Sequence, residues 1–110
     1  MKTIVLLGIS FSVLLGGTYP SLLYHGNCST CHFETKSVSA PSIKLVRKHY
    51  MNAFPNRDKF VKYMSEWVYS PKKETSLMQG AIEKYELMPH LAYDKKTLEE
   101  IAGFIYDMKF

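Results

Sequence analysis

The sequence predicts an all-α fold of about five helices, and three observations support this prediction. Apolar residues recur at three- and four-residue spacing in five segments of the chain. No two segments alternate in the way that indicates a β-hairpin. The length of 110 residues suits one domain and argues against a multidomain enzyme. With 46% hydrophobic residues and a net charge of +4, the composition is globular and too weakly basic to indicate a nucleic-acid binder.

The first 18 residues have the layout of a bacterial secretory signal. Lys2 precedes a largely apolar run over residues 4–15, and small residues follow at Gly16 and Gly17. The run is shorter than the ~20 residues that a membrane-spanning helix needs. We therefore expect a cleaved signal over residues 1–18 and an exported, periplasmic domain over residues 19–110. The alternative is an uncleaved signal that anchors the chain to the membrane.

The first three helices are expected in the first part of this domain. The first runs from about Ser21 to His32. The second begins after Ser42, because serine is a preferred residue at the N-cap position. The third begins near Asn56 or Asp58, and Pro71 ends it because proline disfavours helix at the preceding residue.

Two further helices are expected in the remainder of the domain. The fourth begins near Thr75 or Ser76. Residues 86–93 are too irregular in their apolar spacing for a helix. The last helix has the clearest start, since Thr97 and Glu100 have the spacing of a capping box.

The two cysteines lie in the motif Cys28-Ser29-Thr30-Cys31-His32, which is the C-x-x-C-H pattern of covalent haem c attachment. On a helix, residues three apart lie on one face, so both thiols can reach the two vinyl groups along one haem edge. His32 is four residues after Cys28, and its imidazole can bind the iron. We therefore expect Cys28 and Cys31 as the thioether attachment sites and His32 as an iron ligand.

Three other interpretations of the cysteine pair are weaker. A structural disulfide across one turn closes a very small loop and stabilises little. A thiol–disulfide redox pair is typical of a βαβ context, and no strand pattern surrounds the motif. A zinc site needs a second pair of ligands at suitable spacing, which the sequence lacks.

The chain resembles the monohaem class I c-type cytochromes along nearly all of residues 19–110. The matching segments, in order, are Leu23-Tyr24, the C-x-x-C-H motif, Ser39-Ala40-Pro41-Ser42, Met88-Pro89 and residues 97–105. The resemblance implies a small cytochrome c fold wrapped around one covalent haem c. It also implies that the Pro41 carbonyl accepts a hydrogen bond from His32. Phe104 is then the aromatic residue of the closing helix that packs on the N-terminal helix.

An iron bound to His32 has one further axial position, and a methionine thioether there raises the reduction potential and blocks other ligands. Met88 is the first candidate because it lies in a non-helical segment just before Pro89. Met78, near the expected start of the fourth helix, is the second. The other methionines after the signal lie in expected helices, where core packing is their expected role: Met51, Met64 and Met108.

Three histidines are rivals for the same position: His25, His49 and His90. A second histidine ligand would lower the potential. His90 is only two residues from Met88, so one segment can present either ligand. Lone histidines on small domains are more often surface residues, and we expect these three to be so.

Trp67 and the basic residues each have a structural and a functional interpretation. Trp67 lies on the apolar stripe of the third helix and is expected to pack in the core. The functional alternative is a hydrogen bond from its indole N–H to a haem propionate. The basic residues form two groups: Lys44, Arg47 and Lys48 on one helix face, and Lys72-Lys73. They are expected at a solvated surface, with the steering of an acidic redox partner as the alternative.

The sequence thus predicts an exported electron carrier, and not an enzyme, since no acid–base pair or activated nucleophile is recognisable. Its expected partners are other redox proteins that dock transiently, with no nucleic acid. Membrane association is expected only if the N-terminal segment is retained. The alternative is a haem-based ligand-binding or sensing protein whose sixth position is open or taken by histidine.

Overall fold

In the computed structural model, the described residues, 19–110, form helices and connecting segments with no strand among them. The elements are α1 (Tyr19–Asn27), α2 (Ile43–Ala53), α3 (Arg57–Tyr69), a 3-10 helix η1 (Lys73–Thr75), α4 (Gln79–Tyr85) and α5 (Lys95–Asp107). The predicted all-α class is confirmed for this part of the chain. The expected signal over residues 1–18 lies outside the described residues.

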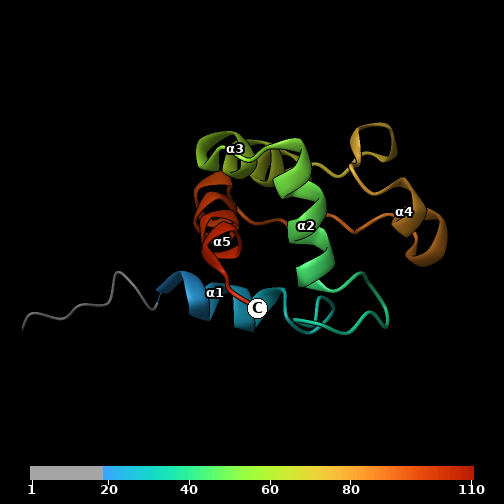
Figure 1. Cartoon of the computed structure of the whole chain (residues 1–110), viewed down its shortest axis with the longest axis horizontal. Coiled ribbons are helices and arrows are strands. Elements are labelled where there is room, and N and C mark those ends of the chain that lie inside the picture. Colours follow the sequence, from blue (N-terminus) through green and yellow to red (C-terminus); the bar gives the residue numbers. More distant parts are fainter. Residues whose placement is uncertain (1–18) are drawn as a thin grey trace, which may run out of the picture.

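α3 and α5 lie side by side, α1 crosses near one end of α5, and α2 packs against both α3 and α5 (Figure 1). Tyr24 of α1 is completely buried, and its ring lies 5.6 Å from that of Phe104 on α5. The aromatic contact expected between the first and last helices is therefore present. Among the described residues, no helix is long and apolar enough to span a bilayer.

Two of the expected helix starts are confirmed by their capping contacts. The Ser42 hydroxyl accepts a hydrogen bond from the Leu45 N–H at 3.2 Å and caps α2. The Asn56 side chain accepts from the Lys59 N–H at 3.2 Å and caps α3. The end of α3 is also as expected, because Ser70 before Pro71 is its C-cap.

Three other helix boundaries differ from the prediction. α1 ends at Asn27 instead of reaching His32. α4 begins at Gln79 and not near Thr75, because Thr75 belongs to the 3-10 helix η1. The capping box at Thr97 is wrong, because Asp94 is the N-cap of α5 and its carboxylate accepts from the Thr97 N–H at 2.7 Å. Thr97 therefore lies inside the first turn of the helix.

Arg47 joins α2 to the C-terminal end of α5. Its Nε donates to the carbonyl oxygens of Ile105 and Tyr106 at 3.1 Å, and its Nη2 donates to Tyr106 at 2.8 Å. Carbonyls in the last turn of a helix have no partner further along it, and a cation there complements the helix dipole. The expectation that Arg47 forms a solvated basic surface with Lys44 and Lys48 is thus wrong for the arginine.

This contact predicts an unequal effect of two charge-removing substitutions on α2. We expect Arg47→Met to lower the free energy of unfolding by about 1–2 kcal/mol, because charged hydrogen bonds to half-buried carbonyls are lost. Lys48→Met removes the same charge from an exposed site of the same helix and should change it by less than about 0.5 kcal/mol. Urea unfolding followed by circular dichroism measures both. Equal losses in the two variants would contradict the role assigned to Arg47.

Candidate cofactor site

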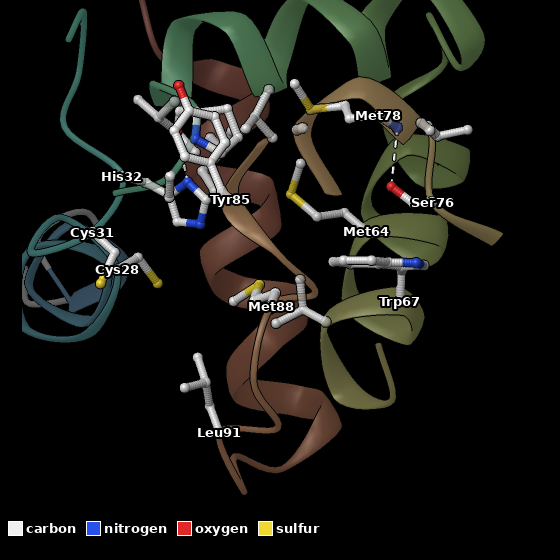
Figure 2. Close-up of a pocket in the computed structure, with 18 of the residues that line it drawn as sticks. Cys28, Cys31, His32, Met64, Trp67, Ser76, Met78, Tyr85, Met88 and Leu91 are labelled. Atoms are coloured by element: carbon white, nitrogen blue, oxygen red, sulfur yellow. Dashed lines mark hydrogen bonds between the residues drawn. The ribbon is translucent and has the colours of Figure 1, made fainter. Parts of the chain in front are cut away.

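A cavity in the described part of the chain is lined by six of the residues that the sequence singled out: Cys28, Cys31, His32, Pro41, Trp67 and Met88. Its remaining lining is mainly apolar and comes from α2, α3, α5 and the segment around α4 (Figure 2), with Asn27 of α1 and residues 39–40 added. The volume of this cavity that the centre of a water-sized sphere can reach is ≈ 230 Å³. One water needs only about 10–15 Å³ on this measure, so the cavity has room for a group of many atoms.

The C-x-x-C-H motif forms a single helical turn directly after α1. The Cys28 carbonyl accepts hydrogen bonds from the N–H groups of Cys31 at 3.3 Å and of His32 at 2.9 Å. The Tyr24 hydroxyl donates to the His32 carbonyl at 2.9 Å and ties this turn to the buried part of α1. The turn places both cysteines and the imidazole at one wall of the cavity (Figure 2).

The imidazole of His32 is oriented by the backbone of Pro41. Its Nδ1 lies 2.8 Å from the Pro41 carbonyl oxygen, the contact that the resemblance implied. A carbonyl oxygen only accepts, so Nδ1 must carry the proton of this hydrogen bond. In the neutral ring Nε2 then has a free lone pair, and this is the atom that can bind a metal.

The two cysteines differ in their surroundings. Cys28 is half-buried and Cys31 is exposed. Burial, and to a lesser degree the neighbouring Cys31, raises the pKa of the Cys28 thiol to about 11. Redox-active C-x-x-C pairs depend instead on a thiolate stabilised by a lowered pKa. Burial thus shifts the pKa of Cys28 in the direction opposite to that found in such pairs.

Three methionines line the cavity: Met64, Met78 and Met88. Met88 lies in the extended segment after α4, as expected, and Met78 is the N-cap residue of α4. Met64 on α3 is only 4% exposed and belongs to the hydrophobic core, as expected. It also lines the cavity, which was not expected from the sequence. A usable signal was its position three residues before Trp67 on one helix face.

The rival histidines do not line the cavity among its described residues. The ring of His25 packs beside those of Tyr24 and Phe104, and the ring of His90 lies 6.2 Å from that of Tyr69. His49 is exposed on α2. Of the two candidate ligand types, methionine thioethers thus line the cavity and the three rival imidazoles do not.

Trp67 lines the cavity from α3, but its indole N–H has a partner in the protein. Nε1 donates to the carbonyl of Lys72 at 3.0 Å. The structure therefore does not present this N–H to a propionate, the functional role considered for Trp67. Trp67 thus forms part of the cavity wall, and its hydrogen bond holds the backbone of Lys72 at the start of the segment that follows α3.

The outer wall of the cavity is the segment 72–93, which we call the strap. It includes η1, α4 and Met88, and it returns past α2 to the start of α5 (Figure 1). No residue of α4 is buried, and α4 makes at most marginal contact with the other helices of the described part. The strap therefore borders the cavity, while its helix α4 is not packed into the hydrophobic core.

Searches for similar proteins find no matching family model, curated protein or solved structure. The cavity is therefore interpreted from its own residues. Within residues 19–110, no three His, Cys, Asp or Glu side chains gather as metal ligands, whereas a structural zinc site takes four.

The contrast between the two thiols predicts different rates of alkylation in protein in which both thiols are free. At about pH 8 we expect Cys31 to react with iodoacetamide on the order of tenfold faster than Cys28, because the thiolate is the nucleophile. The Cys28 rate should keep rising with pH towards its pKa of about 11. The single-thiol variants Cys28→Ser and Cys31→Ser separate the two rates in mass spectra. Equal rates, or a Cys28 rate that levels off near neutral pH, would contradict the assigned environment.

Proposed function

We propose that this chain is a small c-type cytochrome that holds one haem c covalently and carries one electron at a time between larger redox proteins. The observation that carries the proposal is the composition of one cavity. It joins the C-x-x-C-H turn, a histidine oriented by a backbone carbonyl, and a methionine in the facing strap.

The residues of the cavity fit the proposed group. Cys28 and Cys31 supply the two thiols for thioether bonds, and the neutral imidazole of His32 offers Nε2 to the iron. The Met88 thioether is the proposed sixth ligand. The bound haem supplies an iron that alternates between the ferrous and ferric states. The apolar lining excludes water around it and, with a thioether ligand, favours the reduced state.

Each side of the proposed site depends on different parts of the chain. On the histidine side, the Pro41 carbonyl fixes the ring and the Tyr24 hydroxyl fixes the backbone of His32. On the methionine side, the ligand comes from the strap, which no buried residue of α4 secures. The first side is held by hydrogen bonds next to the ligand itself, while the second is held only by hydrogen bonds at the two ends of the strap.

The proposal treats the chain as a carrier without an enzymatic reaction of its own. Transient docking to acidic partner proteins would use exposed lysines such as Lys44, Lys48, Lys72 and Lys73. Nucleic acid is not among the proposed partners. The proposed compartment is the periplasm, with membrane association only through a retained N-terminal segment.

One observation favours a second candidate function, a haem-based ligand-binding or sensing protein. The loose packing of α4 would suit a strap that leaves the sixth position to an external ligand. The two candidates differ in whether Met88 binds the iron in the resting protein.

An absorption spectrum of both oxidation states tests the proposal in protein made with haem-attachment machinery. The carrier predicts a low-spin, six-coordinate spectrum in each state and slow binding of CO by the ferrous form. A five-coordinate ferrous form with rapid CO binding supports the sensor instead. A pyridine haemochrome assay that finds no covalent haem rejects both.

The assignment of Met88 predicts a selective effect of methionine substitution. Met88→Leu conserves volume but removes the thioether, so we expect a five-coordinate ferrous iron that binds CO rapidly. Met51→Leu is the matched control because Met51 packs against the core and does not line the cavity. Its spectrum should equal that of the wild type. A normal spectrum in Met88→Leu, with the change appearing in Met78→Leu or Met64→Leu, would contradict the assignment.

A further inference from the structure

The strap is attached to α3 at its first end by two side-chain hydrogen bonds. The Trp67 indole N–H donates to the Lys72 carbonyl at 3.0 Å, and the Tyr63 hydroxyl donates to the Thr75 carbonyl at 2.5 Å. Both donors belong to α3, which packs firmly against α5. The start of the strap is therefore fixed to the two helices of the described part that pack most extensively against each other.

The last residue of the strap, Tyr93, is attached to a different part of the molecule. Its hydroxyl donates to Oδ1 of Asn27 at 2.6 Å, and both side chains are half-buried. Nδ2 of Asn27 in turn donates to the Leu23 carbonyl at 2.8 Å, which orients the amide with its oxygen towards Tyr93. Asn27 ends α1 and directly precedes Cys28. This hydrogen bond thus joins the methionine segment to the cysteine motif.

The backbone around Met88 needs such an attachment. Two non-glycine residues of the strap have positive φ angles, Glu86 at 73° and Ala92 at 59°. Side chains with a Cβ rarely adopt this conformation, so the surrounding structure has to hold it. The two residues lie on either side of Met88, and Ala92 is the immediate neighbour of Tyr93. No buried residue of α4 holds the segment from the other side.

We propose that the Tyr93–Asn27 hydrogen bond is a positioning contact that holds Met88 over the cavity and limits access of external ligands to the sixth position of the iron. The inference rests on the proposed function, since it concerns the ligand of that same site. When the bond breaks, Asn27 Oδ1 loses its partner and the end of the strap can swing away from α1. Met88 lies five residues before this end, so its thioether leaves with it.

The expected size of the effect follows from the loss of one hydrogen bond. A net contribution of this kind changes an opening equilibrium on the order of 2- to 10-fold. The amount of external ligand bound through the open form changes by the same factor, because binding requires the open state.

The test compares two tyrosine variants of the haem-loaded protein. Tyr93→Phe removes the proposed contact. Tyr106→Phe is the matched control, because its hydroxyl donates to the Pro55 carbonyl at 2.7 Å and the residue does not line the cavity. Titration of the ferric protein with imidazole, followed by the loss of the iron–thioether charge-transfer absorption, should give an apparent affinity on the order of 2- to 10-fold higher in Tyr93→Phe alone. Equal affinities in wild type, Tyr93→Phe and Tyr106→Phe overturn the inference.

Hydrogen exchange supplies a second measurement that does not depend on ligand binding. Backbone amides of residues 86–92 should exchange faster in Tyr93→Phe than in the wild type or Tyr106→Phe. Asn27→Ala also removes the hydrogen bond to the Leu23 carbonyl, so its effect should be at least as large. Adding Tyr93→Phe to Asn27→Ala should then change little, because the bond between Tyr93 and Asn27 is already lost. Unchanged exchange in Tyr93→Phe, or fully additive effects, reject the positioning role.

Failure of the inference is distinguishable from failure of the proposed function. If the wild type lacks covalent haem, or if Met88→Leu keeps the wild-type spectrum, the proposed function or its ligand is wrong and the inference falls with it. If both hold and the Tyr93 variant behaves as Tyr106→Phe does, only the positioning contact is wrong.

Discussion

The inner faces of α2, α3 and α5 form both the hydrophobic core and the wall of the cavity, and the rest of the structure depends on this double use. The residues that belong to both sets are Ile43, Tyr50, Met64, Ile101, Ala102 and Ile105. A chain of this size has little other apolar surface to bury. Interior atoms without neighbours lose their dispersion contacts, so whatever fills the cavity completes the core. A group that bound in this cavity would therefore also stabilise the fold.

The same constraint explains why the two sides of the cavity are built differently. The cysteine turn needs a defined geometry before anything is bound, and it obtains it from local bonds to the Cys28 carbonyl and from the contacts of Tyr24 and Pro41. Under the proposed function, the strap has to admit a large group and then close. It is held at its two ends, by Tyr63 and Trp67 on α3 and by Asn27 on α1.

Local sequence patterns predicted the features of this structure that depend on residues close together in the chain. The caps of α2 and α3 depend on Ser42 and Asn56 and on N–H groups three residues away, so they could be read from sequence. For α5 the sequence correctly predicted a side-chain N-cap but named Thr97 instead of Asp94, because both residue types are favoured at this position. The extended backbone at Asp94, with ψ of 159°, decided between them. The cysteine spacing identified the site for the same reason, as one helical turn determines it.

Contacts between distant segments carried no such signal. The partners of the Tyr93–Asn27 bond are 66 residues apart, and those of Arg47 are 58 and 59 apart. Nothing in the sequence indicated the first contact, and for Arg47 the sequence indicated only a solvated surface. The position of Met64 at the cavity wall likewise depends on how α3 packs against α5.

The division of cations between arginine and lysine follows from these contacts. The chain has only two arginines, and both hold α5: Arg47 at its last carbonyls, and Arg57 through two hydrogen bonds to Asp107 at 3.2 and 3.0 Å. The planar guanidinium suits such fixed, forked contacts, whereas the lysine ammonium is strongly hydrated on a flexible stem. All other cationic side chains, histidine aside, are lysines. A lysine surface attracts an acidic partner at long range but gives up little hydration on contact, which favours rapid association and rapid release. That balance suits the proposed carrier, which would have to leave each partner after one electron.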